Sequence, residues 1–325
     1  EICFVSYGST DGTHKWMDEI SATDPNVKCW WSEREATFSD TFNKASELAS
    51  NDYVAYLHND IVLAPLFIEN LEKHLSPTNV ISYTTIEPPI FAGHSRPGKI
   101  IYDLGTDLNS FNIDSLYSFV DKKINEYRNQ TEPGITFFMC MHRDTLLKIG
   151  GLHNLFDPMF CEDDDLILRC KLMGLNCFTS LDSICYHFVS KTSRFSDEYQ
   201  NRTQQIELKS NKNFIRKWGF RHSIHKKKYN IGFVIYNCKL QGLELLEPWC
   251  DTIYLKDEQN FIIPAYIEKE QPNTKFNLKD KIRANMFNDV DKPNNIIIEF
   301  DVDRLTNQSF NIIQNMSDII AESGA

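Results

Sequence analysis

Residues 53–60 read YVAYLHND, an apolar run that ends in an aspartate. Short apolar runs bounded by polar residues are typical of buried strands. A strand that ends near Asp60 places this carboxylate at the edge of a sheet, where open α/β sheets bind their ligands. We therefore expect a ligand site at the end of this strand.

A second acidic cluster follows later in the chain, where residues 160–169 read FCEDDDLILR. The helix dipole favours acids in a first turn, which accounts for Asp164 and Asp165, and Arg169 is spaced to pair with Asp165. The dipole accounts less well for four consecutive acids. Because neighbouring carboxylates raise one another's pKa, such a cluster suits a proton acceptor. The two clusters together predict a metal-bound diphosphate beside a base, as sugar transfer from a nucleotide requires.

Strand and helix patterns alternate outward from these clusters, which predicts an α/β fold with a mixed, mostly parallel sheet flanked by helices. Residues 87–133 are rich in Pro and Gly and indicate an insertion or lid with one helix at 113–127. The other expected strands are 2–7, 27–31, 53–57, 80–84, 135–141, 177–179 and 183–187, and the other expected helices are 13–20, 39–49, 64–75, 143–149, 164–173 and 195–217.

A new pattern starts at Tyr229, so we predict two domains, 1–222 and a smaller α/β domain at 229–325. In the second domain we expect strands at 229–236, 252–255 and 295–300 and helices at 240–246 and 308–320. Asp301 and Asp303 also end a strand, but neither an acidic helix nor a histidine follows them. We therefore interpret this pair as part of a turn.

The composition is that of a soluble globular protein, and 325 residues suffice for two domains. The net charge of −11 argues against nucleic acid as a partner. The nine cysteines lack the close paired spacing of a zinc site or disulfide framework, which indicates reduced thiols. We find no apolar run long enough to span a membrane and no signal peptide, although the chain begins at Glu1 without a Met. These features predict a cytoplasmic location.

One basic segment departs from the acidic balance. Residues 209–228 contain eight basic side chains and no acid. One interpretation is a solvated helix face followed by a linker. The other is a weak docking surface for phosphates or an anionic membrane.

Several motifs occur in a particular order along residues 1–195. They are residues 41–45 and 51–63, then 150–156 and 162–166, and finally Arg169, Gly174 and the pair 186–187. In order and spacing this set resembles the family 2 glycosyltransferases with the GT-A fold. The resemblance implies a Rossmann-like catalytic domain and an inverting, metal-dependent transfer of a sugar. It favours a UDP- or dTDP-sugar as donor and a hydroxyl, such as one of a glycan, as acceptor.

The resemblance also assigns a metal site. Asp60 matches the last acid of the family's Asp-x-Asp motif, and His187 matches a histidine that completes the site. His58 stands where the family has its first acid, and we place His58 and Asn59 among the nucleotide-sugar contacts. An imidazole with a carboxylate suits Mn²⁺ better than Mg²⁺. The alternative for Asp60 is a cap on a helix that begins at Ala64.

Glu162 and Asp163 match the pair of acids in which the family keeps its base. We assign Asp163 as the base and Glu162 as its orienting or acceptor-binding partner. The remaining donor contacts that the resemblance implies are Ser6, Tyr7, Gly8, Glu33, Asn43, Lys191 and Arg194.

Two other functions use the same residues. A metal-dependent phosphohydrolase would cleave simple phosphate esters without an acceptor sugar. A non-catalytic nucleotide-sugar or carbohydrate-binding module is suggested by His58 in place of the usual acid, and it would bind its ligand without metal-dependent turnover.

Overall fold

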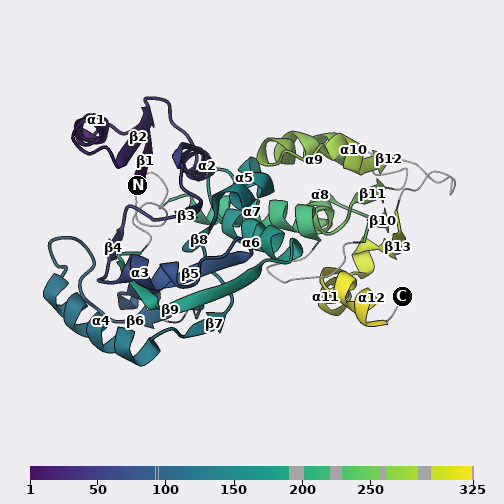
Figure 1. The fold of residues 1–325 in the computed structure, drawn as a ribbon. Coiled ribbons are helices and arrows are strands. Elements are labelled where there is room, and N and C mark those ends of the chain that lie inside the picture. The colour runs from purple at the N-terminus through teal and green to yellow at the C-terminus, as the bar shows by residue number, and fades with distance from the viewer. Residues whose placement is uncertain are drawn as a thin grey trace. The chain divides into compact units, whose positions relative to one another are not determined.

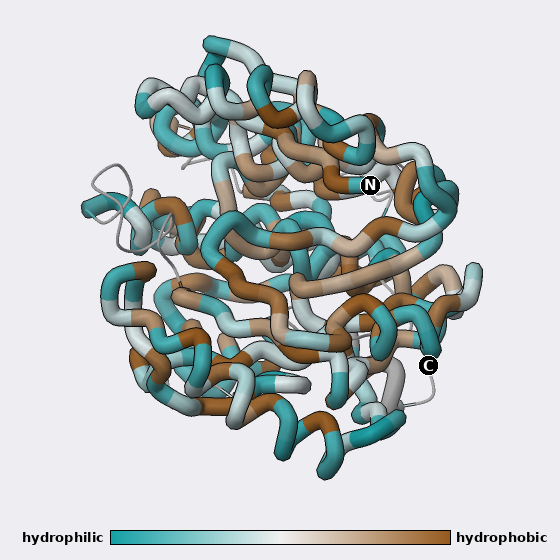
Figure 2. Tube along the Cα trace, turned by 60° about the vertical axis from the view of Figure 1, so that its left-hand side comes forward, coloured by the Kyte–Doolittle hydropathy of each residue, from teal (hydrophilic) through white to brown (hydrophobic). Residues whose placement is uncertain are grey.

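The computed structural model describes residues 1–91, 93, 95–189, 201–219, 229–255, 261–284 and 294–323 (Figure 1). The chain forms two compact units, Glu1–Gln204 and Gln205–Ala325, which we call the N-terminal and C-terminal units. Among the described residues, no helix is both long and apolar enough to cross a bilayer. The trace in Figure 2 accordingly changes between polar and apolar residues at short intervals.

The N-terminal unit begins with a parallel pair of strands, β1 (Ile2–Tyr7) and β2 (Val27–Ser32), joined by helix α1 (Thr13–Thr23). Helix α2 (Phe38–Leu48) follows and contacts β1. Thr37 starts α2 with a capping box, in which Thr37 and Asp40 each bond the other's backbone amide. These four elements agree with the predicted ones.

A seven-stranded mixed sheet forms the centre of this unit, with β3, β8, β5, β9 and β4 in that order. Strand β6 pairs with β5, and β7 pairs with β9. Parallel pairing is confined to β5–β9 and β5–β6, and the other pairs in this sheet are antiparallel. The strands are β3 (Tyr53–Ala55), β4 (Ile61–Leu63), β5 (Asn79–Glu87), β6 (Lys99–Ile101), β7 (Thr131–Pro133), β8 (Met139–His142) and β9 (Asn176–His187).

Side chains alternate between the two faces of β5 and pack against different helices. Ile81 and Tyr83 pack with Phe67 of α3, whereas Ile86 packs with Leu116 and Val120 of α4. The apolar faces of these helices therefore cover the strands that lead to the sheet edge. The helices around this sheet are α3 (Phe67–Glu72), α4 (Ile113–Tyr127), α5 (Arg143–Ile149) and α6 (Glu162–Leu172).

The structure corrects several predicted elements. The helix expected at 64–75 is shorter, because residues 61–63 form β4 against β9 and Leu66 adopts a left-handed conformation before α3. The two extended pieces at 177–179 and 183–187 are one strand, β9. The expected insertion contains β6 and β7 as well as α4, whose bounds agree with the prediction.

The C-terminal unit contains a parallel sheet in the order β12, β11, β10, β13. Its strands are β10 (Ile231–Tyr236), β11 (Thr252–Leu255), β12 (Ile282–Ala284) and β13 (Ile296–Asp301). Its helices include α8 (Leu240–Leu246), α9 (Ile262–Glu270), α10 (Leu278–Lys281), α11 (Asn307–Gln314) and α12 (Met316–Ser323). Residues 308–320, expected as one helix, are thus divided between α11 and α12. Asp301 accepts a hydrogen bond from the amide of Asp303 at 3.0 Å, in agreement with the predicted turn.

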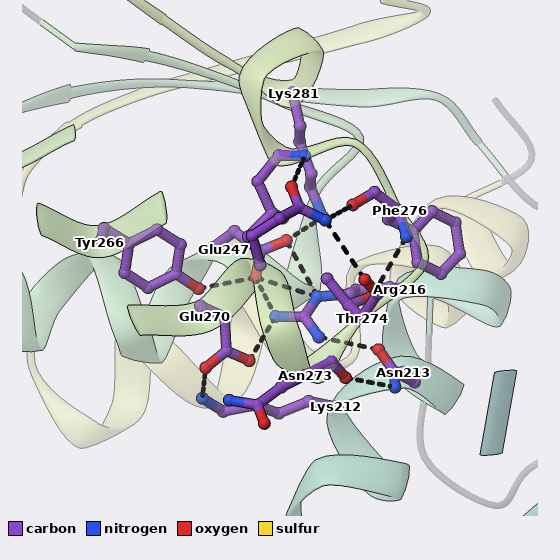
Figure 3. A network of polar contacts seen from close by, with 12 residues as sticks. Lys212, Asn213, Arg216, Glu247, Tyr266, Glu270, Asn273, Thr274, Phe276 and Lys281 are labelled. Atoms are coloured by element: carbon purple, nitrogen blue, oxygen red, sulfur yellow. Dashed lines mark hydrogen bonds and ion pairs between the residues drawn. The ribbon is translucent and has the colours of Figure 1, made fainter. Parts of the chain in front are cut away.

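Helix α7 (Thr203–Trp218) packs mainly with the C-terminal unit, although the sequence placed residues up to 222 in the first domain. The reason is Arg216, which is 4% exposed and bonds Glu247 at 2.6 Å and Glu270 at 2.8 Å (Figure 3). Lys281 lies 2.7 Å from Glu247, and Tyr266 also bonds this carboxylate. These contacts hold α7 among α9, α10 and the turn around Glu247. The limits of the two functional domains stay a prediction.

Candidate metal and nucleotide-sugar site

Three strand ends bring acidic and imidazole side chains to one edge of the seven-stranded sheet. Asp60 immediately precedes β4, Glu87 ends β5 and His187 ends β9. The antiparallel register of β4 and β9 pairs Ile61 with His187, and the amide of Phe188 donates to the carbonyl of Asp60 at 3.0 Å. The sheet register itself therefore brings together residues that lie far apart in the sequence.

His58, Asp60 and His187 form a cluster in which one ligand atom from each lies within 4.8 Å of the others. Asp60 Oδ1 is 3.5 Å from His187 Nε2 and 3.7 Å from His58 Nδ1. Both distances are too long for good hydrogen bonds. Asp60 is not placed as the cap of a helix at Ala64, because β4 follows it.

The residues of this cluster fit a divalent cation. Asp60 Oδ1 and His58 Nε2 are buried and have no hydrogen-bond partner in the part of the chain that the structure describes. Leaving such atoms unpaired costs free energy, which a bound ion would recover. One carboxylate oxygen with two imidazoles is a donor set for a transition metal ion such as Mn²⁺. His58, which the sequence placed among the nucleotide-sugar contacts, thus joins the predicted ligands Asp60 and His187.

The electrostatics of the cluster favour an ionised carboxylate. Burial would raise the pKa of Asp60, but His187 and His58 beside it hold this pKa well below its usual range. Burial lowers the pKa of His58 despite the neighbouring Asp60. For His187 the effect of burial is outweighed by Asp60 and Glu87, which raise its pKa. Asp60 is therefore available as an anionic oxygen ligand.

Aromatic rings enclose the two histidines. The ring of Phe138 lies 4.9 Å from both His58 and His187, and Phe137 lies 4.8 Å from His58. Tyr56, at the end of β3, packs 5.6 Å from His58. This apolar wall strengthens the electrostatic interactions inside the site because it excludes water.

Two residues that the sequence analysis missed lie behind the cluster. Glu87 accepts a hydrogen bond from His187 Nδ1 at 2.9 Å and is paired with Arg96. The other guanidinium nitrogen of Arg96, NH1, is buried without a partner among the described residues. Glu87 was missed because it ends a strand whose predicted limit was Thr84, and Arg96 because the insertion has no clear periodicity. A buried guanidinium nitrogen with no partner is a ready donor to an anion.

The acidic cluster begins α6, after Phe160 and Cys161 adopt left-handed backbone conformations. Glu162 is 7% exposed, and its Oε2 is buried with no partner among the described residues. Burial, together with the nearby Asp163, raises the pKa of Glu162 well above its ordinary value. Asp163 is half-buried. The two neighbouring carboxyl groups therefore have different environments, as acid–base pairs in enzymes do.

The helix that begins with these acids lies near the metal-ligand cluster. Both Glu162 and Asp60 raise the pKa of the buried Tyr56 phenol, after the larger effect of burial. Tyr56 thus has one candidate carboxylate of each cluster in its surroundings.

Asp165 and Asn43 have structural partners. Arg169 bonds Asp165 at 2.9 Å, as its spacing predicted, and also donates to the carbonyls of Ile149 and Gly151. Asn43 accepts from the amide of Leu152 at 2.8 Å and donates to its carbonyl at 2.9 Å. Asn43 therefore holds the loop before α6, and its contact with a donor stays a prediction.

The loop after β1 contains three predicted donor contacts. The hydroxyl of Ser6 bonds Ser9 at 2.7 Å, and Tyr7 packs against Trp30. Gly8 has a φ of +60°, which glycine adopts readily, and its amide bonds the carbonyl of Ser32. Glu33 and Asn59 are exposed and, together with this loop, stay predicted donor contacts.

Some predicted residues fall outside the described part of the chain, namely Lys191, Arg194 and the basic residues at 221 and 226–228. Within the described part of the basic segment, Arg216 is buried and Lys212 lies 3.5 Å from Glu270. These two charges have partners within the C-terminal unit, and the docking surface stays a prediction.

Residues 1–150 match the model of the family described as Glycosyl transferase family 2. The matched region is thus similar to the family 2 glycosyltransferases. The match includes His58, Asp60, Glu87 and Arg96 and ends before Gly151. The acidic start of α6 and His187 lie beyond the matched residues, and the pairing of β4 with β9 brings His187 to Asp60.

Two solved structures are similar to the chain at low identity. One is the mannosyltransferase PcManGT from Pyrobaculum calidifontis in complex with GDP-Man and Mn²⁺, at 17% identity and a TM-score of 0.39, covering 59% of this chain and 48% of that one. The other is GalNAc-T7 with UDP, GalNAc and Mn²⁺, at 12% identity and a TM-score of 0.47, covering 68% of this chain and 42% of that one. The chain therefore spans about half the length of these structures or less. The comparison with curated proteins gave no match.

Proposed function

We propose that the protein is an inverting, Mn²⁺-dependent glycosyltransferase that uses a nucleotide-diphosphate sugar. The observation that carries this proposal is the His58–Asp60–His187 cluster at the sheet edge of a family 2-like region. Asp60 Oδ1 and His58 Nε2 are buried without a hydrogen-bond partner among the described residues, and Asp60 Oδ1 lies 3.5 Å from His187 Nε2. A cation that also binds a diphosphate explains both features.

A donor diphosphate would bind between this cluster and Arg96. Mn²⁺ held by His58, Asp60 and His187 would supply positive charge that stabilises the departing diphosphate. Arg96 NH1, which has no partner among the described residues, would be a second donor to the same phosphates. The resemblance of the sequence favours a UDP- or dTDP-sugar, with Ser6, Tyr7, Gly8 and Glu33 on the nucleoside.

The reaction at the anomeric carbon then uses the two acids that begin α6. Asp163 accepts the proton of an acceptor hydroxyl as this oxygen attacks the anomeric carbon. The attack comes from the face opposite the diphosphate, whose bond to the sugar breaks with its electron pair leaving on the nucleoside diphosphate. Glu162, whose pKa is raised mainly by burial, keeps its proton and donates a hydrogen bond that orients the acceptor.

Incubation with a panel of UDP-, dTDP- and GDP-sugars, with and without Mn²⁺, tests this proposal. We expect Mn²⁺-dependent release of one nucleoside diphosphate, slowly with water as acceptor and faster with acceptor glycans. The anomeric configuration of the first product, measured by NMR, should be opposite to that of the donor. Retention of configuration would contradict the single attack described above.

The same assay separates the two alternative functions. Cleavage of simple phosphate esters together with no release of nucleoside diphosphate from any sugar donor would favour a phosphohydrolase. Binding of a nucleotide sugar without turnover, at any Mn²⁺ concentration, would favour a non-catalytic module. Asp60→Ala is the matched negative control for each activity, because it removes the anionic ligand of the cluster.

A further inference from the structure

Glu87 lies directly behind His187, on the side of the imidazole that faces away from Asp60. One carboxylate oxygen of Glu87 is 2.9 Å from His187 Nδ1, whereas His187 Nε2 is 3.5 Å from Asp60 Oδ1. Glu87 is only 4% exposed. The imidazole is therefore held between two carboxylates that contact different ring nitrogens.

Hydrogen-bond donors surround both carboxylate oxygens of Glu87. Arg96 is paired with Oε1, and Lys99 Nζ lies 3.6 Å from Oε2. The hydroxyl of Thr85 also donates to Oε1, at 3.3 Å. Because Arg96, Lys99 and Thr85 all donate toward these oxygens, the oxygens act as acceptors, and the proton between Glu87 and His187 belongs to Nδ1.

The proton on His187 Nδ1 determines whether Nε2 carries a proton or a lone pair. In a neutral imidazole with its proton on Nδ1, Nε2 carries a lone pair. The lone pair then faces Asp60 Oδ1, which has no hydrogen-bond partner among the described residues. Two acceptors that face each other at this distance repel, and a cation between them removes the repulsion.

We propose that Glu87 is the positioning residue of the metal site, which fixes His187 with its Nε2 lone pair toward the ion. This inference rests on the proposed function, because it concerns the same site. Carboxylates that accept from the distal nitrogen of a histidine ligand orient the ring and increase its basicity. Arg96 and Lys99 in turn hold Glu87 in place, so that two strand ends and the insertion all contribute to one ligand.

The affinity for Mn²⁺ alone, measured by calorimetry on the full chain, tests the role of Glu87. We expect about 10–100-fold weaker binding for Glu87→Ala, since removing the hydrogen-bond partner of a histidine ligand has effects of this size. Glu87→Gln should fall between Glu87→Ala and the wild type, because its carbonyl still accepts from Nδ1 but carries no charge. Glu126→Gln is the matched control, since Glu126 forms an exposed ion pair with Lys123, and it should bind Mn²⁺ like the wild type.

The tautomer of His187 provides a test that needs no variant at Glu87. In metal-free wild-type protein labelled with ¹⁵N-histidine, NMR at alkaline pH should show the proton of His187 on Nδ1. His187→Gln assigns the signal. A proton on Nε2 would overturn the proposal even if the Glu87 variants failed to fold.

The outcomes also separate this inference from the function on which it rests. If the wild type binds Mn²⁺ and both Glu87 variants bind it equally well, the role of Glu87 is wrong and the metal site stands. If the wild type binds no Mn²⁺, the metal site is wrong and the role of Glu87 falls with it.

Discussion

Both units of the molecule bury charged side chains, but they treat them in opposite ways. In the C-terminal unit, Arg216 is enclosed by Glu247, Glu270 and Asn213 through hydrogen bonds of 2.6–3.1 Å (Figure 3). In the N-terminal unit, Asp60, His58, Arg96 and Glu162 each keep a buried polar atom without a partner among the described residues. Removing one partner from a network of buried charges is costly, whereas several buried polar atoms without partners call for an explanation such as a bound ion.

Several unpartnered polar atoms close together are stronger evidence for a ligand site than a single such atom. His74 Nε2 is also buried without a partner among the described residues, but it lies beside Phe178, at the start of β9 rather than at its end. The metal-ligand cluster combines a carboxylate and two imidazoles within 4.8 Å. We therefore expect substitutions in the metal-ligand cluster to affect function and substitutions in the network around Arg216 to affect stability.

Asp60→Ala should have the largest effect on function. It removes the anionic ligand, so we expect turnover and the Mn²⁺-dependent part of nucleotide affinity to be lost, a decrease of about 10³-fold or more. The melting temperature should change little, because the carboxylate is not part of a closed network. Release of nucleoside diphosphate and thermal melting measure the two effects. Asp121→Ala, on the exposed side of α4, is the control, and near-normal turnover of Asp60→Ala would show that the metal site is wrong.

Glu247→Gln should have the opposite profile. It leaves the buried Arg216 and Lys281 without their shared carboxylate, so unfolding of the C-terminal unit should cost about 3–5 kcal/mol less. Mn²⁺ affinity should stay that of the wild type. Urea unfolding measures the difference, with Glu244→Gln as control because Glu244 forms a more exposed pair with Lys269. An equal loss of unfolding free energy in Glu247→Gln and Glu244→Gln would mean that the buried network stabilises the unit no more than a surface ion pair does.

The network of Glu247, Arg216 and Lys281 also predicts that the stability of the C-terminal unit depends on pH. Burial alone would raise the pKa of Glu247, but Lys281 and Arg216 lower it to about 2 from the ordinary 4.5. Because the folded-state pKa is lowered, this stabilisation is complete above about pH 4.5 and is lost as the pH falls toward 2. It amounts to about 3 kcal/mol at most. Urea unfolding across this range should show a steeper decline for the wild type than for Glu247→Gln, and parallel declines would contradict the assignment.

Asp163→Asn tests the proposed catalytic base in the N-terminal unit. The amide is nearly isosteric but cannot accept the proton, so kcat should fall about 10²-fold or more while donor binding is kept. Asp164→Asn, on the same helical turn, should retain kcat within a few-fold. A matching loss of donor affinity in Asp163→Asn would instead make this residue a contact of the donor.

Arg96→Lys should have the smallest effect of the set. The lysine keeps the charge beside Glu87 but cannot present a second nitrogen to the diphosphate, so affinity for UDP with Mn²⁺ should fall about tenfold. Arg143→Lys is a suitable control, because this guanidinium donates to the backbone carbonyls of Ser46 and Glu47. Unchanged UDP affinity, measured by calorimetry, would remove Arg96 from the donor site.

The sequence predicted those parts of the fold that depend on local pattern. The helix expected at 113–127 has the bounds of α4, and the alternation of strands and helices predicted the α/β class. Strand β4 was missed because its three apolar residues, 61–63, are too few to form a local pattern. Its identity as a strand depends on pairing with β9, which a local pattern does not contain.

The same distinction applies to the site. Asp60 and His187 were identified by motif resemblance, and the register of β4 and β9 brings them together. Glu87 carries no motif of its own and acquires its role only through contact with His187. The placement of α7 required the partners of Arg216, which come from parts of the chain 31 and 54 residues away.

The most direct test of the central claim is an anomalous-scattering map from crystals of the protein grown with Mn²⁺ and UDP. We predict one strong manganese peak within ligand distance of His58, Asp60 and His187, with the diphosphate of UDP completing its coordination. A site at this sheet edge that holds UDP without manganese, or a manganese peak bound elsewhere, would contradict the account.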